Sequence, residues 1–187
     1  MSARFALRDT PIAGVGVFNR LPIGDHRGSL ERLFCADDLR QLVGDRAIRQ
    51  INLTVTRRRG TTRGMHFQHP PFAEMKIVTC LRGRVFDVAV DLRRDSPTFL
   101  RWHAELLSPD HHASIVIPEG CAHGFQTLED DCEMLYLHTA AYASAAEGGV
   151  HAEDPRIAIA WPEPIAELSA RDAGHPWLGA DFAGLVP

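Results

Sequence analysis

Four polar side chains lie inside an otherwise apolar stretch, residues 61–90. Arg63, His66, Gln68 and Lys76 alternate there with runs rich in Val, Ile and Phe. Charged and polar groups are seldom buried for packing alone, because removing them from water costs free energy unless they gain partners. We therefore expect these side chains to line one cavity, and this stretch to hold the functional site.

His66 and Lys76 are residue types suited to moving a proton next to a carbonyl group. Histidine has an unperturbed pKa of about 6.5, so it accepts a proton near neutral pH. A nearby lysine ammonium favours the neutral imidazole and can stabilise a developing oxyanion. A second histidine, His123, lies between apolar residues of the segment 121–128. One such histidine is usually a core residue, but two within one barrel favour a site.

Tyr136 and Asp172 are the candidates to complete this chemistry. Tyr136 lies in the apolar segment 133–139, where it is either an aromatic core residue or a proton donor facing His66 across a bound substrate. Asp172 lies in a polar tail, where it is either solvated or bonded to His66 in a way that raises the basicity of the imidazole. The sequence alone does not place Asp172 near His66.

A bound metal is the main alternative. Pro118-x-Gly120-x-x-His123 matches the second half of the cupin metal motif, whose first half has two histidines flanking one residue, then a glutamate. This chain has His66-Phe67-Gln68 followed by Glu74. Gln68 removes a good nitrogen ligand, although His66, Glu74 and His123 could still hold a divalent metal. On these residues we favour a metal-free site.

Many short apolar segments separated by turn signals predict the elements that position these residues. The spacing of about 8–12 residues predicts an all-β fold, an antiparallel jelly-roll barrel with a few short helices. The expected strands are an N-terminal strand within 4–24, then 29–34, 49–56, a hairpin of 75–81 and 84–92, and 99–107, 112–117, 121–128 and 133–139. The segment 37–43 is expected to be a helix. We expect one domain over 1–187, with a core of about 20–162 and an irregular C-terminal segment, 163–187, containing a short helix.

One of these segments, and the pair His66 and Lys76, carry further predictions. In 49–56, alternation puts Gln50, Asn52 and Thr54 on one face, but the pattern does not decide whether that face lines the cavity or meets solvent. If His66 and Lys76 lie on adjacent strands, both reach one interior.

Composition limits the class of protein. The chain has 187 residues, a formal charge of −4, no long basic tract and no apolar stretch approaching the length of a membrane span. Its N-terminus lacks the apolar core of a signal peptide. We expect a soluble cytoplasmic protein without a nucleic-acid or membrane partner. Its four cysteines show no CxxC spacing, so free buried thiols are expected.

At these residues the chain resembles the dTDP-4-dehydrorhamnose 3,5-epimerase family, metal-free cupins of nucleotide-sugar biosynthesis. The resemblance covers about residues 20–180. It is carried by Asp25-x-Arg27-Gly28, Gln50-x-Asn52, Arg63-Gly64-x-His66-Phe67-Gln68, Pro70-Pro71, Lys76, FDVAVDLR, Ser96-Pro97-Thr98-Phe99, Ala122-His123-Gly124-Phe125, Leu135-Tyr136, Asp154-Pro155, Trp161-Pro162 and Leu168-Ser169-x-x-Asp172.

The resemblance implies a homodimeric, cofactor-independent epimerase. Its substrate would be a nucleotide-diphosphate 4-keto-6-deoxy-hexose, above all the dTDP-linked precursor of L-rhamnose, inverted at C3, C5 or both. The resemblance gives His66 the role of base, Asp172 that of its partner, Lys76 that of enolate stabiliser and Tyr136 that of acid. Further positions match as pocket residues, His123 and Tyr142, and as residues that hold the nucleotide diphosphate, Arg27, Gln50, Asn52, Arg63 and Glu147.

Departures from the family pattern bear on the substrate. The usual Ala-Gln-Gly-Lys is Ala73-Glu74-Met75-Lys76, the usual Lys-x-Thr is Leu137-His138-Thr139, and the usual tandem tyrosines are Ala141-Tyr142. The tryptophan usual before Asp154 is absent. The alternatives to a 3,5-epimerase are a 3-only or 5-only epimerase, a metal-dependent cupin isomerase or oxygenase, and a non-catalytic module that binds sugar nucleotides.

Overall fold

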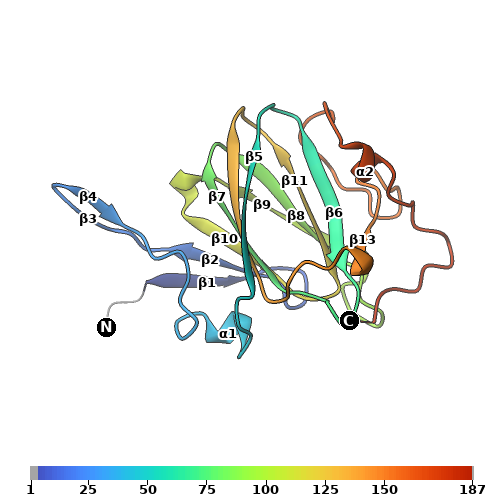
Figure 1. The fold of residues 1–187 in the computed structure, drawn as a ribbon, viewed down its shortest axis with the longest axis horizontal. Coiled ribbons are helices and arrows are strands. Elements are labelled where there is room, and N and C mark those ends of the chain that lie inside the picture. The colour runs from blue at the N-terminus through green and yellow to red at the C-terminus, as the bar shows by residue number, and fades with distance from the viewer. Residues whose placement is uncertain (1–3, 187) are drawn as a thin grey trace.

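Two antiparallel sheets face each other in a jelly roll (Figure 1), as the sequence predicts. The computed structural model describes residues 4–186, so residues 1–3 and 187 of the predicted domain lie outside it. The six-stranded sheet has the order β1 (Phe5–Asp9), β2 (Gly16–Arg20), β10 (Ala113–Ile117), β7 (Lys76–Arg82), β12 (Cys132–His138) and β5 (Gln50–Thr56). The five-stranded sheet has the order β13 (Glu147–Gly149), β6 (Thr62–Gln68), β11 (Cys121–Thr127), β8 (Val85–Asp91) and β9 (Trp102–Leu107).

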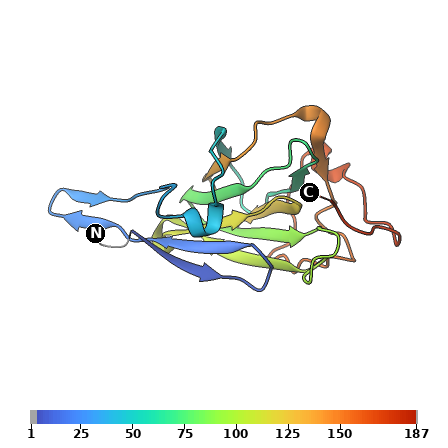
Figure 2. The ribbon, with the colours of Figure 1, turned by 90° about the horizontal axis from the view of Figure 1, so that it is seen from below.

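The remaining elements are short. A hairpin of β3 (Ile23–Asp25) and β4 (Gly28–Leu30) projects away from the barrel in both views (Figures 1 and 2). The helices are α1 (Arg40–Val43), α2 (Ala170–Ala173) and two 3₁₀ turns, η1 (Pro109–His111) and η2 (Ser144–Ala146). The C-terminal segment is irregular apart from α2, as predicted. Between residues 4 and 186 no helix has the length and apolarity to span a membrane.

The predicted central hairpin is wrong. β7 pairs with β10 and β12 in one sheet, whereas β8 pairs with β9 and β11 in the other, so the turn at Gly83 carries the chain from sheet to sheet. The condition considered for His66 and Lys76, that they lie on adjacent strands, is not met. They lie on β6 and β7, which belong to opposite sheets, and they meet across the interior.

Several boundaries also differ from the prediction. The strand expected at 29–34 ends at Leu30, the helix expected at 37–43 begins at Arg40, and the strand expected at 99–107 begins at Trp102. Leu100 has a φ of 61°, a left-handed conformation that a strand does not accommodate. These shifts leave the identity of the main strands unchanged.

Apolar side chains fill the space between the sheets and also cover part of each outer face. The inner cluster includes Val78, Ile115, Phe125 and Met134, all almost fully buried. The outer face of the six-stranded sheet packs under Leu39 and Val43 around α1, and that of the five-stranded sheet packs under the segment from Ile157 to Leu185. Burying each large apolar side chain stabilises the fold by roughly 1.5–3 kcal/mol.

All four cysteines are free, as predicted, and three of them are buried. Burial raises the pKa of the Cys80 and Cys121 thiols to about 12. These thiols are therefore protonated at neutral pH and act as small apolar side chains.

β6 and β11 approach closely at Gly64, which lies two residues before His66. Gly64 has a φ of +133°, and a Cβ there would lie 2.6 Å from Gly124 Cα and 3.0 Å from His123 O. The strand register shifts at this point, between His123 and Phe125. Only glycine fits this conformation and spacing without strain. The close approach places His66 directly opposite His123.

We predict that Gly64→Ala lowers the free energy of unfolding by about 2–6 kcal/mol, because the strained backbone and the backbone clash each cost about 1–3 kcal/mol. Gly28→Ala is the matched control, since Gly28 has a φ of +139° with nothing within 4 Å of its Cβ position. It should cost only the backbone term, about 1–3 kcal/mol. Denaturant unfolding of the two variants measures the difference. Equal losses of unfolding free energy in the two variants would show that the clash with β11 does not add to the cost of Gly64→Ala.

Candidate active site

A cavity of about 450 Å³ opens between the two sheets and brings the predicted chemical groups together. Arg63, His66, Gln68 and Lys76 all line it, as the sequence suggested. Tyr136, His123, Tyr142 and Glu147 also line it, and Asp172 reaches it from the C-terminal segment. The face of β5 that carries Asn52 and Thr54 lines this cavity, and Asn52 is exposed at its mouth.

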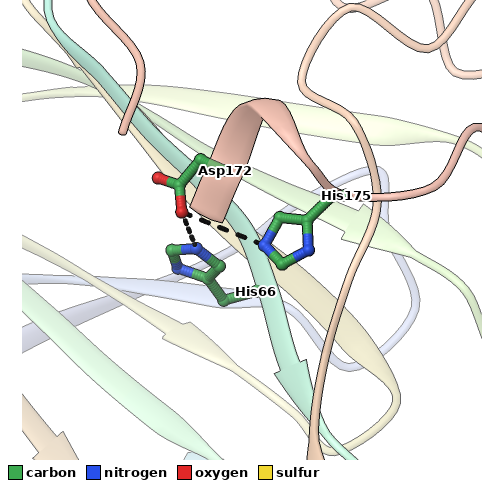
Figure 3. A group of neighbouring side chains, drawn as sticks. All are labelled: His66, Asp172 and His175. Carbon is green, nitrogen blue, oxygen red and sulfur yellow. Dashed lines mark hydrogen bonds and ion pairs between the residues drawn. The ribbon is translucent and has the colours of Figure 1, made fainter. Parts of the chain in front are cut away.

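The half-buried His66 and the buried Asp172 form a pair although 106 residues separate them. His66 Nε2 lies 2.9 Å from Asp172 Oδ1, and the backbone N–H of Gly64 donates to Asp172 Oδ2 at 3.1 Å. The backbone N–H of Asp172 donates to Ser169 Oγ, which caps α2. Figure 3 shows the carboxylate reaching from α2 toward the imidazole. Because a carboxylate only accepts, Nε2 carries the hydrogen and Nδ1 keeps the lone pair that a base needs.

The surroundings keep this imidazole neutral and this carboxylate ionised. Burial lowers the pKa of His66, opposed by the Asp172 carboxylate and reinforced by the charges of Lys76 and Arg171. Burial alone would raise the pKa of Asp172, but the hydrogen bond from His66 and the donation from Gly64 hold it well below its usual value. At neutral pH the pair is therefore an uncharged base supported by an anion.

Lys76 and Tyr136 face His66 from the opposite sheet. Lys76 Nζ donates to the backbone oxygen of His66 at 3.2 Å and lies 3.4 Å from Glu74 Oε1. Burial lowers the pKa of Lys76, and the Glu74 carboxylate opposes that shift. Burial raises the pKa of Tyr136 well above its usual value. The phenol therefore keeps its proton at neutral pH and is able to donate it.

His123 forms a second histidine–carboxylate pair at the base of the cavity. Its Nε2 lies 2.9 Å from Asp87 Oδ2, and both side chains are buried. The His123 ring packs edge-on to Tyr136, with ring centroids 5.8 Å apart. His123 thus packs against Tyr136 from the opposite sheet.

Two of the predicted nucleotide-binding residues lie outside the cavity lining. Gln50 lies at the rim, where its amide donates to Asn52 Oδ1 at 3.0 Å and accepts from the Tyr142 backbone N–H at 3.0 Å. Arg27 lies at the tip of the projecting hairpin and pairs with Asp25 at 2.6 Å. The structure does not bring Arg27 to the cavity of its own chain.

Sequence reasoning missed two side chains of this site, Arg171 and His138, and with them the pairing of Glu74 with His138. The Arg171 guanidinium lies 3.2 Å from Asp172 Oδ1, 2.9 Å from Glu147 Oε1 and 3.2 Å from His66 Nε2. An arginine beside an aspartate in a polar tail gives no sequence signal. The charge of Glu74 was a visible departure from the family, but its partner His138 lies 64 residues away.

The ligands of the alternative metal site are engaged elsewhere. His66 pairs with Asp172, His123 with Asp87, and Glu74 with His138 and Lys76. A different group, His66, Asp172 and His175, places its donor atoms within 4.8 Å of one another (Figure 3). The guanidinium of Arg171 contacts two of those donors, and its positive charge opposes a metal cation there.

The fold and the cavity define a class of protein, a cupin jelly roll with a histidine–carboxylate base, a buried lysine and a buried tyrosine around one pocket. The family model described as dTDP-4-dehydrorhamnose 3,5-epimerase matches residues 9–180. The chain belongs to this family.

Individual relatives agree with this assignment. A dTDP-4-dehydrorhamnose 3,5-epimerase of Streptomyces griseus is 39% identical over 184 residues, 97% of this chain and 91% of that protein. A dTDP-4-dehydrorhamnose 3-epimerase of Streptomyces niveus is also 39% identical over 184 residues, 97% of this chain and 88% of that protein. The crystal structure of the dTDP-6-deoxy-D-glucose-3,5-epimerase of Legionella pneumophila Philadelphia 1, in complex with dTDP-4-keto-L-rhamnose, matches with a TM-score of 0.89 at 32% identity. It covers 98% of this chain and 99% of that one.

We predict that Asp172→Asn lowers the pKa of His66 further, because the carboxylate is what opposes the effect of burial. A base with a lower pKa stays neutral to lower pH, so the variant imidazole should take up its proton only in more acidic solution. Imidazole NMR titration measures this without substrate, with the His66 signal assigned from its absence in His66→Ala. Asp91→Asn, which alters a buried aspartate outside the cavity lining, should leave the His66 titration in place. A higher His66 pKa in Asp172→Asn would contradict the pairing.

Proposed function

We propose that this protein is a cofactor-independent epimerase of a dTDP-linked 4-keto-6-deoxy-hexose, acting at C3, C5 or both. The observation that carries the proposal is the convergence of His66, Lys76 and Tyr136 on one cavity, from opposite sheets, with the Asp172 carboxylate behind the histidine. The names of the relatives support the substrate class, because they describe epimerases of dTDP-linked deoxysugars.

The geometry fits a proton-transfer reaction without any redox step. The hydrogens at C3 and C5 are both alpha to the C4 ketone, so their removal gives an enolate. In our proposal His66 takes the proton through Nδ1, and the Lys76 ammonium stabilises the negative oxygen at C4. Tyr136 returns a proton to the carbon from the opposite face, which inverts the centre. Asp172 stabilises the imidazolium that forms on His66.

The same groups serve one inversion or two. A 3-epimerase and a 3,5-epimerase both occur among the relatives at 39% identity. The catalytic groups therefore support the reaction type, and the number of centres inverted is a matter for measurement. For the nucleotide diphosphate we propose Arg63, Asn52, Gln50 and Glu147 at the cavity and its rim, with Tyr142 beside Gln50 as a further pocket residue.

The activity is tested by proton NMR of dTDP-4-keto-6-deoxy-D-glucose in deuterium oxide without added metal. We expect loss of the signals at C3, C5 or both with the native protein. His66→Ala should slow exchange by at least about 10²-fold, because it removes the base. Its affinity for dTDP should stay within a few fold, since the residues proposed for the nucleotide lie elsewhere.

Each outcome of this experiment is informative. Exchange at one position alone identifies a single-site epimerase. Binding of the sugar nucleotide without exchange at either position supports a non-catalytic binding module, and exchange that disappears on chelation supports the metal-dependent alternative. Near-native exchange by His66→Ala would end the assignment of His66 as the base.

We also propose that the chain acts as a homodimer in which Arg27 serves the cavity of the second copy. β5 is an edge strand of the six-stranded sheet, and its outward face carries the exposed apolar residues Ile51, Leu53 and Val55. Exposed edges with apolar faces favour pairing with another chain. The projecting hairpin also exposes Ile23 and Leu30 around Arg27. Since Arg27 does not reach its own cavity, a nucleotide-binding role requires a second chain.

Light scattering should give twice the chain mass of 20.7 kDa, and Leu53→Glu should shift the protein toward the monomer because it places a charge in the apolar face.

Mixing Arg27→Ala with His66→Ala tests the position of Arg27. Heterodimers would hold one complete site, so the mixture should recover up to about a quarter of native exchange. A monomeric, fully active native protein would overturn the dimer, and a dimer whose mixture gains no activity would place Arg27 elsewhere.

A further inference from the structure

A row of hydrogen bonds runs along the mouth of the cavity and ends at Glu74. The amide of Gln50 donates to Asn52 Oδ1 at 3.0 Å, and Asn52 Nδ2 lies 3.4 Å from His138 Nε2. On the other side of that ring, His138 Nδ1 lies 2.8 Å from Glu74 Oε2. The second oxygen of Glu74 lies 3.4 Å from Lys76 Nζ. Glu74 therefore joins the rim of the cavity to the lysine at its centre.

The strand register places this row. His138 on β12 is the register partner of Lys76 on β7 and of Gln50 on β5, so the three side chains lie side by side on one face of the six-stranded sheet. Glu74 comes just before β7 and is buried between two of them. The ring of His138 also stacks on Tyr136, with centroids 6.0 Å apart and an interplanar angle of 19°.

The carboxylate sets the direction of every bond in the row. An ionised carboxylate only accepts, so His138 must donate from Nδ1, which in the neutral imidazole leaves Nε2 as an acceptor. That acceptor requires the NH₂ of Asn52 to point at the ring, so the Asn52 carbonyl is left to accept from Gln50. A neutral residue in place of Glu74 removes this constraint.

The same carboxylate provides the nearest compensation for the charge of Lys76. The side chains of Glu74 and Lys76 are only 7% and 10% exposed, and burial of an ammonium favours the neutral amine. Burial alone would raise the pKa of Glu74, but the hydrogen bond from His138 and the charge of Lys76 lower it. Glu74 is thus an anion under the conditions in which Lys76 needs a counter-charge.

We propose that Glu74 is a positioning residue of this site, which orients Asn52 and Gln50 through His138 and keeps Lys76 protonated through its own charge. Its consequence for turnover rests on the epimerase function proposed above. Its effects on the lysine and on nucleotide affinity do not depend on that function.

Lys76 can be observed directly because it is the only lysine in the sequence. Protein made with ¹³C-labelled lysine gives a single side-chain signal whose pH titration reports the Lys76 pKa. Several charged or titratable groups face this ammonium besides Glu74, namely His66 on β6, His138 on β12, Glu147 on β13, and Asp87 on β8.

Glu74→Gln is expected to lower the pKa of Lys76 and to weaken dTDP binding by about two- to tenfold, the worth of one hydrogen bond in an ordered row. His138→Phe keeps a ring against Tyr136 and keeps the carboxylate beside Lys76, so it should weaken dTDP binding alone. Glu74→Asp keeps the charge and should leave the Lys76 pKa above that of Glu74→Gln. The matched control is Glu105→Gln, which breaks a 2.7 Å pair with His103 outside the cavity lining and should change neither quantity.

The lysine titration decides the proposal. An unchanged Lys76 pKa in folded Glu74→Gln would overturn it, as would equal titrations for the Gln and Asp variants. Unchanged dTDP affinity in both Glu74→Gln and His138→Phe would overturn the role in orienting Asn52. If the native protein exchanges no sugar protons, the epimerase proposal fails while the titration still gives its result. If it does, the alkaline limb of the kcat/KM profile should move to lower pH in Glu74→Gln.

Discussion

Burying charge between two sheets is the constraint on which the rest of this structure depends. The cavity holds an ammonium, several carboxylates and three imidazoles in a barrel whose remaining interior is mainly apolar. Each such group is costly to remove from water unless a partner compensates it. Asp172 is matched by His66, Asp87 by His123, and Glu74 by His138 and Lys76. The site is therefore a set of matched pairs, and each pair compensates the polar groups that it buries.

The jelly roll supplies what such pairs require. Strands from two facing sheets present side chains to one interior at fixed register, so groups far apart in sequence meet without flexible loops between them. Apolar clusters on the outer faces pack against both sheets. The close approach at Gly64 then fixes the position of His66 opposite His123 on β11. The packing that stabilises the fold is thus the same packing that aligns the base with the lysine and the tyrosine.

The sequence predicts the strands well and their pairing poorly. Short apolar runs bounded by turn residues identify β5, β7, β8, β11 and β12 to within a residue or two. Because both outer faces are covered, β7 and β8 read as continuous apolar runs rather than alternating ones. Such runs carry no information about which face or which sheet they join. A hairpin and a crossing between sheets then look alike.

The same distinction applies to the site. His66, Lys76 and Tyr136 stand out because polar chemistry inside apolar strands is unusual. Asp172 could be placed only through the family resemblance, since its contact with His66 spans 106 residues. His138 and Arg171 gave no signal, because a histidine at a strand end and an arginine in a polar tail are ordinary surface residues until their partners are known. Arg27 shows the reverse case, a family position whose side chain lies away from its own cavity.

The partner of the base is carried by the tail, on a helix of four residues that lies over β6. The same tail supplies Leu178, Phe182 and Leu185 to the apolar layer over the outer face of the five-stranded sheet. Local opening of the tail would therefore remove the partner of the base and expose that apolar face in one step. The integrity of the base and the stability of the sheet beneath it are thus coupled properties of this chain.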